Sequence, residues 1–313
     1  MKEINANTRL CAVLGQPIHH SASPAMQNAG ILELGLNWRY LAFEVDPREL
    51  GSVIFAAKSM RFIGLNLTVP HKLIALPMVD IVDESATFWG AINTIRFEGL
   101  GSNDVWVPMG ELNHGQAREV RSRGFNTDAD AVIRALKEDA HLDVSGKHVL
   151  VLGAGGAGRV AALRLAAEGV NTLYLVNRTQ QKCEEIAAIV HRHFPKVQTI
   201  LDYPKTPVDL VLNATSAGLN PTDPLPWDES RFSLRGTIVA FDMIYRPAKT
   251  LFLTKAEEAG CRIANGLGML LFQGVKALEL WSGQPAPVEV MKRALHENIY
   301  GKMVHDSPKK EHS

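Results

Sequence analysis

A glycine-rich stretch at residues 153–158 has the residue types and spacing that most directly indicate a ligand. Gly153, Gly155 and Gly158 fit the pattern G-x-G-x-x-G, between an apolar run of strand type and an apolar helical pattern. In that context the glycines permit a tight turn, close approach of a pyrophosphate and close packing of helix on strand, and the helix N-terminus attracts phosphate. We therefore predict a dinucleotide site; the alternative is a glycine-rich turn without a ligand. The remaining residues of this predicted site are Ala154, Gly156 and Ala157.

The polar residues that follow the next apolar run bear on which dinucleotide binds. An NAD site usually carries Asp or Glu there, which bonds the ribose 2′-hydroxyl. This chain instead has Asn177, Arg178 and Thr179, with Lys182 three residues further on. Two cations and a hydroxyl match an adenosine 2′-phosphate better than a free hydroxyl, so the sequence favours NADP over NAD. The alternative is that Arg178 only caps a surface turn.

A second polar group occurs in the first part of the chain. Asn66 and Thr68 are two apart in an apolar run of strand type, so they share one face, and Lys72 follows shortly after. Ser21 and Ser23 precede a predicted helix, where hydroxyls beside a helix N-terminus can bind a carboxylate. One interpretation is that amide, hydroxyl and ammonium point to one place, beside serine hydroxyls that bind a carboxylate. The other is a half-exposed strand, a solvated lysine and two serines that only serve a turn and a helix N-cap; taken alone, the strand pattern favours this second interpretation.

The elements that must position these residues follow an α/β pattern. Strand-type runs alternate with helical patterns, which favours a mainly parallel sheet covered by helices in the first part and a Rossmann-type domain from residue 147 on. Strands are predicted at 10–14, 39–45, 62–69, 91–97, 148–152, 172–176, 209–213, 237–241 and 261–264. In the first part, helices are predicted from 23 to 35, from 46 and from about 71, and a hinge near 126–130 precedes a helix that ends at about 139. In the second part, helices are predicted at 156–168, 179–193, 250–259, 267–281 and 288–300.

The predicted boundaries are 1–127 for a substrate domain and 128–271 for an NADP-binding domain, with about 272–313 returning to the first. The last helix lies beyond the natural end of the second sheet, so we expect it to pack back on the first domain. The segment 98–123 is polar, with one apolar island, and we expect a long loop or a hairpin extension. It would form a lid, alter substrate choice, make an oligomer contact, or be a surface hairpin that does none of these.

Composition restricts the class of protein. The chain has 313 residues, and its 33 Lys and Arg balance 33 Asp and Glu. Without an excess of positive charge there is no electrostatic reason to expect nucleic acid or an acidic membrane as partner. Cys11, Cys183 and Cys261 are far apart and have no metal-ligand spacing, which fits a reducing compartment. No signal peptide or membrane span is evident, so we expect a cytoplasmic protein. We also expect a monomer or homodimer, and no metal.

Short motifs along the chain resemble, in a single order, those of the shikimate dehydrogenase family. Residues 16–24 are similar to its P-x-x-H-S-x-S-P segment and 66–72 to its N-x-T-x-P-x-K segment. Residues 90–94 and 124–128 are similar to its G-A-x-N-T and G-x-N-T-D segments. Further matches lie at 153–158, 177–179, 213–218, 242–247 and 265–269. The resemblance spans roughly 11–283, and the departure that matters is a longer stretch between the G-A-x-N-T and G-x-N-T-D segments.

This resemblance implies reversible reduction of 3-dehydroshikimate to shikimate with NADPH. It implies that Lys72 and Asp128 flank the reacting hydroxyl and handle its proton, and that Ser21 and Ser23 hold the substrate carboxylate. The further substrate contacts that it implies are Asn66, Thr68, Asn93, Tyr245 and Gln273. The further cofactor contacts are Thr215, Met243 and Gly266. From its own surroundings, a glutamine in the apolar run 269–278 is either a ligand contact or an interhelix hydrogen bond.

Three other interpretations remain. A quinate/shikimate dehydrogenase using NAD would share the substrate motifs, but Arg178 and Lys182 argue against NAD. A non-catalytic sensor of shikimate-type ligands is expected to lack Lys72 or Asp128, and both are present. Another two-domain NADP-linked dehydrogenase, such as one acting on methylene-tetrahydrofolate, would not be expected to carry the Ser-x-Ser-Pro and Asn-Thr-Asp segments.

Overall fold

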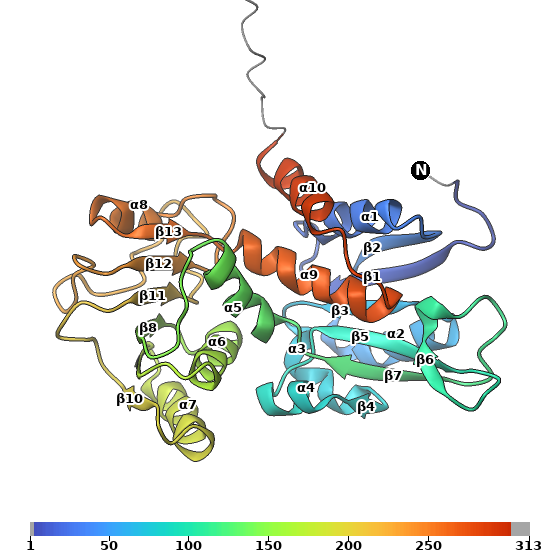
Figure 1. Ribbon diagram of the computed structural model, residues 1–313, viewed down its shortest axis with the longest axis horizontal. Helices are drawn as coiled ribbons and strands as arrows, with labels where there is room; N and C mark the ends of the chain where they lie inside the picture. The colour runs from blue at the N-terminus through green and yellow to red at the C-terminus, as the bar shows by residue number, and fades with distance from the viewer. Residues whose placement is uncertain (1–2, 302–313) are drawn as a thin grey trace, which may run out of the picture.

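The computed structural model describes residues 3–301 and contains two β-sheets, with helices α5 (Asp128–Glu138) and α9 (Leu267–Ser282) between them (Figure 1). The first sheet belongs to the N-terminal half of the chain and the second to the C-terminal half, as predicted. Residues 302–313, which fall in the predicted C-terminal return of the chain, lie outside the described residues.

The N-terminal sheet has the strand order β2-β1-β3-β5-β7-β4, with β6 paired to β5. The predicted parallel arrangement holds for β1 with β2 and β3 and for β4 with β7. Strand β5 instead runs antiparallel to β3, β6 and β7, so the sheet is mixed. The strands are β1 Arg9–Gly15, β2 Trp38–Glu44, β3 Gly64–Leu67, β4 Ile81–Val82, β5 Thr94–Leu100, β6 Trp106–Pro108 and β7 Val120–Phe125.

The helical elements of this half include two that differ from the predictions. The predicted helix at residue 71 is only one turn, α3, and α4 was not predicted. The N-cap of α1 is Ala22 and not Ser23, which is the first helical residue. The elements are α1 Ser23–Glu33, η1 Pro47–Glu49, α2 Leu50–Ser59, α3 His71–Ile74, η2 Leu76–Met78, α4 Glu84–Trp89 and η3 Met109–Glu111.

The C-terminal sheet is all parallel in the order β10-β9-β8-β11-β12-β13, the doubly wound order of a Rossmann fold. Its strands β8, β11 and β12 are almost wholly buried because helices cover both faces, which explains their nearly continuous apolar sequences, whereas the edge strands β10 and β13 are partly exposed. The elements are β8 His148–Leu152, α6 Gly156–Ala167, β9 Thr172–Val176, α7 Gln180–His193, β10 Gln198–Ile200, β11 Leu210–Asn213, β12 Val239–Asp242, α8 Leu251–Glu258 and β13 Arg262–Ala264.

Helices α9 and α10 (Val288–Tyr300) carry the chain back to the N-terminal sheet, as predicted (Figure 1). Trp281, at the end of α9, is fully buried and donates a hydrogen bond from Nε1 to the Ile95 carbonyl of β5 at 3.0 Å. Gly30 of α1 leaves room for α10, since a Cβ there would lie 2.9 Å from the Met291 sulfur. The substrate-side sheet is therefore completed by residues near the end of the chain.

The segment 98–123 is a hairpin extension and not a loop. Strands β5 and β7 pair from Thr94 to Gly99, and the turn between them is docked against the sheet. Arg9 donates from Nη1 to the carbonyls of Met109 and Leu112 at 2.6 and 2.8 Å, which fixes the turn. None of its residues lines the substrate cavity described below, so the geometry gives no support to a lid.

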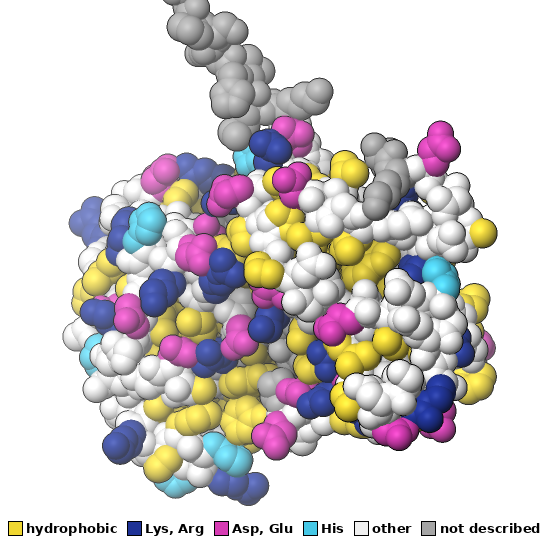
Figure 2. All heavy atoms as spheres, turned by 45° about the vertical axis from the view of Figure 1, so that its right-hand side comes forward, with side chains coloured by type: hydrophobic (Ala, Val, Ile, Leu, Met, Phe, Trp, Pro, Cys, Tyr) yellow, Lys and Arg dark blue, Asp and Glu magenta, His cyan; other side chains and the backbone are white. Residues whose placement is uncertain are grey.

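The surface and the helices match an ordinary globular chain. Lys, Arg, Asp and Glu side chains are intermingled over the face in Figure 2. Among residues 3–301, no helix is both long and apolar enough to cross a membrane. Over the same described range, no group of three or more His, Cys, Asp or Glu side chains is arranged to hold a metal ion.

Candidate active site

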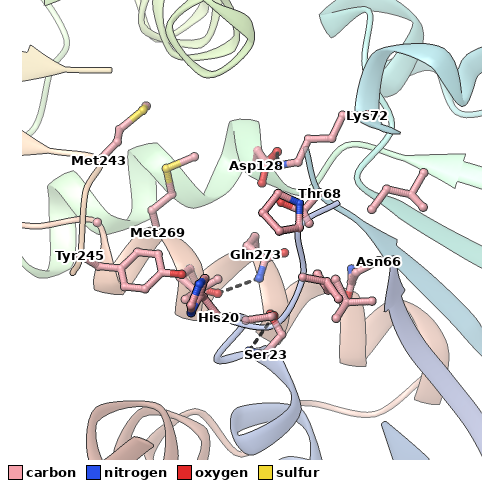
Figure 3. Close-up of a pocket in the computed structure, with 17 residues that line it drawn as sticks. His20, Ser23, Asn66, Thr68, Lys72, Asp128, Met243, Tyr245, Met269 and Gln273 are labelled. Carbon is pink, nitrogen blue, oxygen red and sulfur yellow. Dashed lines mark hydrogen bonds and ion pairs between the residues drawn. The ribbon is translucent and has the colours of Figure 1, made fainter. Parts of the chain in front are cut away.

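A cavity of about 310 Å³ lies between the two halves of the chain (Figure 3). The N-terminal half supplies most of its polar groups, the C-terminal half one wall, and α9 its floor. The predicted site residues that line it are Ser21, Ser23, Asn66, Thr68, Lys72, Asp128, Met243, Tyr245, Gly266 and Gln273. The structure thus brings ten of the predicted residues together from segments that are far apart in the sequence.

Lys72 and Asp128 form an ion pair at the edge of this cavity. The Lys72 Nζ lies 2.6 Å from the Asp128 Oδ2, and the two side chains are 32% and 12% exposed. Lys72 comes from the short helix α3, and Asp128 is the first residue of α5. A carboxylate at a helix N-terminus is favoured by the free N–H groups and the dipole of the helix. The pair can therefore hold and transfer a proton next to a bound ligand.

Asn93 lies behind Asp128 and not in the cavity wall. It is 1% exposed, and its Nδ2 donates to the Asp128 Oδ1 at 2.8 Å. Its Oδ1 accepts from the Thr127 backbone N–H at 2.7 Å. Asn93 therefore fixes the orientation of the carboxylate, since each Asp128 oxygen has one defined partner. Its predicted contact with substrate stays a prediction.

Asn66 is held in a similar way. Its Nδ2 donates to the Thr94 Oγ1 at 3.0 Å and the Asn93 carbonyl at 3.3 Å, and its Oδ1 accepts from the Tyr40 hydroxyl at 2.7 Å. Both amide protons are used, so only the oxygen can accept a further hydrogen bond from a ligand. Tyr40 was not predicted as part of the site. It is fully buried, and burial raises the pKa of its hydroxyl well above the usual value, so it stays neutral and can donate.

The cavity also contains residues whose roles the sequence left open. The Gln273 Nε2 donates to the Leu270 carbonyl at 2.8 Å, within its own helix, so this bond does not connect two helices. Its position in the cavity wall agrees with the ligand-contact alternative (Figure 3). His20 lies beside Tyr245 in the same wall and was missed, although it belongs to the P-x-x-H-S-x-S-P segment. Apolar lining residues such as Ile18 and Met269 carry no distinguishing signal in the sequence.

Tyr245 is held by one hydrogen bond of its own and by the bonds of the residues that precede it. The Tyr300 hydroxyl of α10 donates to the Tyr245 carbonyl at 2.5 Å. Nearby, the fully buried Asp242 accepts from the Ile244 N–H at 3.0 Å and from the Thr250 hydroxyl at 2.5 Å. Burial outweighs these hydrogen bonds and raises the pKa of Asp242 to about 6. The loop after β12 is thus fixed both by a buried carboxyl group and by the last helix.

A second cleft, of about 630 Å³, lies at the carboxyl ends of the strands of the C-terminal sheet. Gly153 has a φ of +102°, which favours glycine, and a Cβ on Gly158 would lie 2.1 Å from the Gly153 carbonyl oxygen. A Cβ on Gly155 or Gly156 would meet nothing within 4 Å, so the backbone at the start of α6 is open to a ligand. Gly153 and Gly158 are therefore needed for the turn, and Gly155 and Gly156 leave space for a phosphate. This fits the dinucleotide prediction.

The polar residues around this cleft divide into partly buried side chains that fix the backbone and exposed cations. The Asn177 Oδ1 accepts from the Ala154 N–H at 3.0 Å, which ties the glycine turn to the end of β9. The Thr215 hydroxyl donates to the Asn213 Oδ1 at 2.7 Å and fixes the loop after β11. Arg178 and Lys182 are exposed and line the cleft, as a 2′-phosphate site requires. Thr179 also lines it, whereas Ala154, Gly156 and Ala157 are not among its lining residues.

Met243 and Gly266 lie where the C-terminal half meets the substrate cavity. A Cβ on Gly266 would lie 2.0 Å from the Met243 carbonyl oxygen, so the two strand ends approach each other closely there. Both residues line the cavity that holds Lys72 and Asp128. A dinucleotide bound at the glycine turn and extended to this point would place its reactive ring beside a substrate.

The fold and the two sites together define a two-domain dehydrogenase of the nicotinamide-dependent class. The chain matches the family model of the shikimate dehydrogenase substrate binding domain over residues 13–95. It also matches those of shikimate / quinate 5-dehydrogenase over 135–221 and of the shikimate 5′-dehydrogenase C-terminal domain over 266–296.

The chain is similar throughout its length to curated and solved members of that family. It is 39% identical to the NADP⁺ shikimate dehydrogenase of Moorella thermoacetica, over 95% of this chain and 96% of the relative. It is 38% identical to that of Desulforamulus reducens, over 95% and 97%. A shikimate dehydrogenase solved with NADP⁺ superposes with a TM-score of 0.80 at 33% identity, over 95% and 98%.

The chain therefore belongs to the shikimate dehydrogenase family. The predicted family and fold class are confirmed, and with them the prediction of an NADP-linked oxidoreductase of this family. The residue-level roles are not tested by these similarities and stay predictions.

Proposed function

We propose that this protein catalyses the reversible, NADPH-dependent reduction of 3-dehydroshikimate to shikimate. The observation that carries the proposal is the Lys72–Asp128 pair, 2.6 Å apart, in a cavity that also contains Met243 and Gly266 from the C-terminal half. Reduction of a carbonyl needs a hydride and a proton at neighbouring points. The pair supplies the proton, and Met243 and Gly266 line the part of the cavity where a dinucleotide bound to the C-terminal half would supply the hydride.

The hydride and the proton of the reduction come from different groups. NADPH supplies the hydride that adds to the carbonyl carbon. The Lys72 ammonium donates a proton to the carbonyl oxygen as that oxygen gains charge, so the product is a neutral hydroxyl. Lys72 is left as an amine and takes a proton from solvent after product release. Asp128 accepts a hydrogen bond from Lys72 and keeps the ammonium directed at the reacting oxygen. The oxidation of shikimate follows the same steps in reverse.

The rest of the cavity is suited to a hydroxylated acid. We assign the carboxylate to the hydroxyls of Ser21 and Ser23 at the start of α1, where the helix N-terminus adds a favourable potential. We assign ring hydroxyls to Thr68, Tyr245 and Gln273, which line the same cavity. The oxygen of Asn66 accepts one further hydrogen bond. Substrate and cofactor contact different halves of the chain, so closure of the cleft would exclude water before hydride transfer.

The predicted organisation of the chain supports this function. We propose the division into 1–127 with about 272–313 as substrate domain and 128–271 as cofactor domain, because each predicted unit contains one sheet. We propose a cytoplasmic enzyme, and its three cysteines are free and buried, which is compatible with a reducing compartment. A monomer or a homodimer, with small-molecule ligands and neither nucleic acid nor membrane as partner, remains our proposal for its assembly.

The test is the absorbance of reduced nicotinamide with purified protein, shikimate or quinate, and NADP⁺ or NAD⁺. Fast reduction of NADP⁺ with shikimate, and slow reduction in the other three combinations, is the expected result. Turnover only with quinate or NAD⁺ would identify the alternative dehydrogenase. Binding of shikimate by calorimetry, with no turnover in any combination, would instead support the sensor and contradict the proposed role of Lys72 and Asp128.

A further inference from the structure

The cofactor cleft contains one more cation than the sequence motifs indicated. Arg231 lines the same cleft as Arg178 and Lys182, although it lies in the segment between β11 and β12 and belongs to none of the motifs discussed above. The three cations therefore approach the cleft from two different connections of the sheet. A doubly wound sheet binds its ligand at the carboxyl ends of the strands, so a cation in this position faces the cofactor.

Two contacts position the Arg231 side chain, which is 54% exposed. Its guanidinium lies over the Tyr203 ring, 5.0 Å from the centroid, in cation–π geometry. Its Nη2 donates to the Asp202 Oδ1 at 2.5 Å. Asp202 and Tyr203 follow β10, the strand next to β9. The guanidinium is thus held beside the strand ends where the adenosine portion of a dinucleotide lies in this fold.

The segment 227–232, which carries Arg231, is itself anchored to Tyr203 and to its own backbone. Phe232, next to Arg231, is buried and stacks on Tyr203 with an interplanar angle of 11°. The Asp228 N–H donates to the Tyr203 hydroxyl at 3.0 Å, and the Trp227 Nε1 donates to the Phe232 carbonyl at 3.1 Å. The Tyr203 ring, over which the Arg231 guanidinium lies, is therefore held in place.

The pairing with Asp202 has a consequence for the choice of dinucleotide. A carboxylate near the adenosine ribose attracts a free 2′-hydroxyl and repels a 2′-phosphate. β9 ends without one. Asp228 lines the cleft, and Asp202 follows the neighbouring strand β10 without lining the cleft. Arg231 pairs with Asp202, and the two side chains are 54% and 58% exposed. Arg231 thus adds a cation for the phosphate and masks an anion that would oppose it.

We propose that Arg231, positioned by Tyr203 and Asp202, is a third determinant of 2′-phosphate recognition beside Arg178 and Lys182. The proposal rests on the proposed use of NADP and extends it to a residue outside the motifs. Its test uses nucleotide fragments without a nicotinamide ring, so that it does not depend on turnover of any substrate.

The experiment is calorimetric titration of the full-length protein with adenosine 2′,5′-bisphosphate and with adenosine 5′-monophosphate. Arg231→Ala should weaken binding of the bisphosphate about tenfold, as expected for one charge-assisted contact, and that of the monophosphate less than twofold. Arg235→Ala is the matched control, because Arg235 is exposed in the same segment but does not line the cleft. It should change neither affinity more than twofold.

A second variant tests the masking of the carboxylate. Asp202→Asn removes the negative charge and keeps a polar partner for the guanidinium, so the bisphosphate should bind about threefold more tightly and the monophosphate unchanged. Equal effects of Arg231→Ala on both nucleotides, no effect on either, an Arg235→Ala effect as large, or weaker bisphosphate binding in Asp202→Asn would each overturn the proposal. Shikimate oxidation by the unaltered protein separates this failure from failure of the proposed reaction.

Discussion

The substrate cavity and the cofactor cleft position their polar side chains in different ways. In the cavity, Asn66 and Asn93 are 5% and 1% exposed, and each has several hydrogen-bond partners within the protein. In the cleft, Arg178 and Lys182 are exposed, and the fixed part is the backbone of the glycine turn. Proton transfer needs one geometry with little tolerance, whereas recognition of a phosphate needs mainly charge and space. Substitutions in the two regions should therefore affect different kinetic constants.

The largest expected effect is that of Lys72→Ala, which removes the proton donor from the cavity. We expect kcat to fall about 10³-fold, the usual contribution of a positioned general acid, with shikimate affinity kept within a few-fold. Steady-state kinetics together with calorimetric titration of shikimate measure both quantities. Lys276→Ala, at an exposed position of α9 outside the cavity, is the control. A kcat near that of the unaltered protein would exclude Lys72 as the proton donor.

The next effect concerns the residue behind the carboxylate. Asn93→Ala removes the donor to the Asp128 Oδ1 and leaves the carboxylate free to turn away from Lys72. We expect kcat to fall about 10–100-fold with little change in the KM for shikimate, because small misplacements of a catalytic group cost that much. A rise in KM with kcat unchanged would instead mean that Asn93 contacts the substrate itself.

In the cofactor cleft, Arg178→Asp should raise the KM for NADP and leave kcat nearly unchanged. We expect the KM for NADP to rise about 10–100-fold, since a charge-assisted contact is replaced by repulsion of the 2′-phosphate, with a much smaller change for NAD. Initial rates with each cofactor at saturating shikimate measure this. Arg192 lies near the end of α7, the helix that follows Arg178, and does not line the cleft. Arg192→Asp therefore controls for the change in net charge. Equal changes for both cofactors would remove Arg178 from the phosphate site.

The last effect concerns stability and not catalysis. The ordinary pKa of Asp242 is 3.8, and burial raises it to about 6 in the folded chain. Between these values the unfolded chain has released the proton that the folded chain still holds, so stability is lost as pH rises through this window. Relative to Asp242→Asn, which does not titrate, the free energy of unfolding should fall by about 2–3 kcal/mol from pH 4 to pH 7. Denaturant titrations at several pH values measure it, and a pH-independent difference would contradict this account.

The sequence predicted the C-terminal sheet more accurately than the N-terminal one. β8 and β9 lie at the predicted residues, because a parallel strand buried on both faces has an unbroken apolar run. β4 and β10 have two and three residues, too few for any periodicity, and both were missed. The antiparallel direction of β5 depends on pairing with distant strands, so the alternating pattern could not reveal it.

The candidate site shows the same division. The sequence located ten of the residues that line the substrate cavity and seven of those that line the cofactor cleft, through local spacing and the family motifs. The position of Asn93 was not predictable, because its N–H bonds the Phe125 carbonyl and its amide meets Asp128 only through the pairing of β5 with β7. Tyr40 and Arg231 belong to no motif, and three-dimensional contacts alone bring them to the sites.

The independence of the two regions is tested most directly by a double-mutant cycle of Asn93→Ala and Arg178→Asp on kcat/KM for NADP. The two residues share no hydrogen-bond partner among the described contacts, so their effects should multiply. We predict that the deficit of the double variant equals the product of the single deficits within about twofold. A double variant that is no worse than either single one would show that the two regions position the same group, and would contradict their separation.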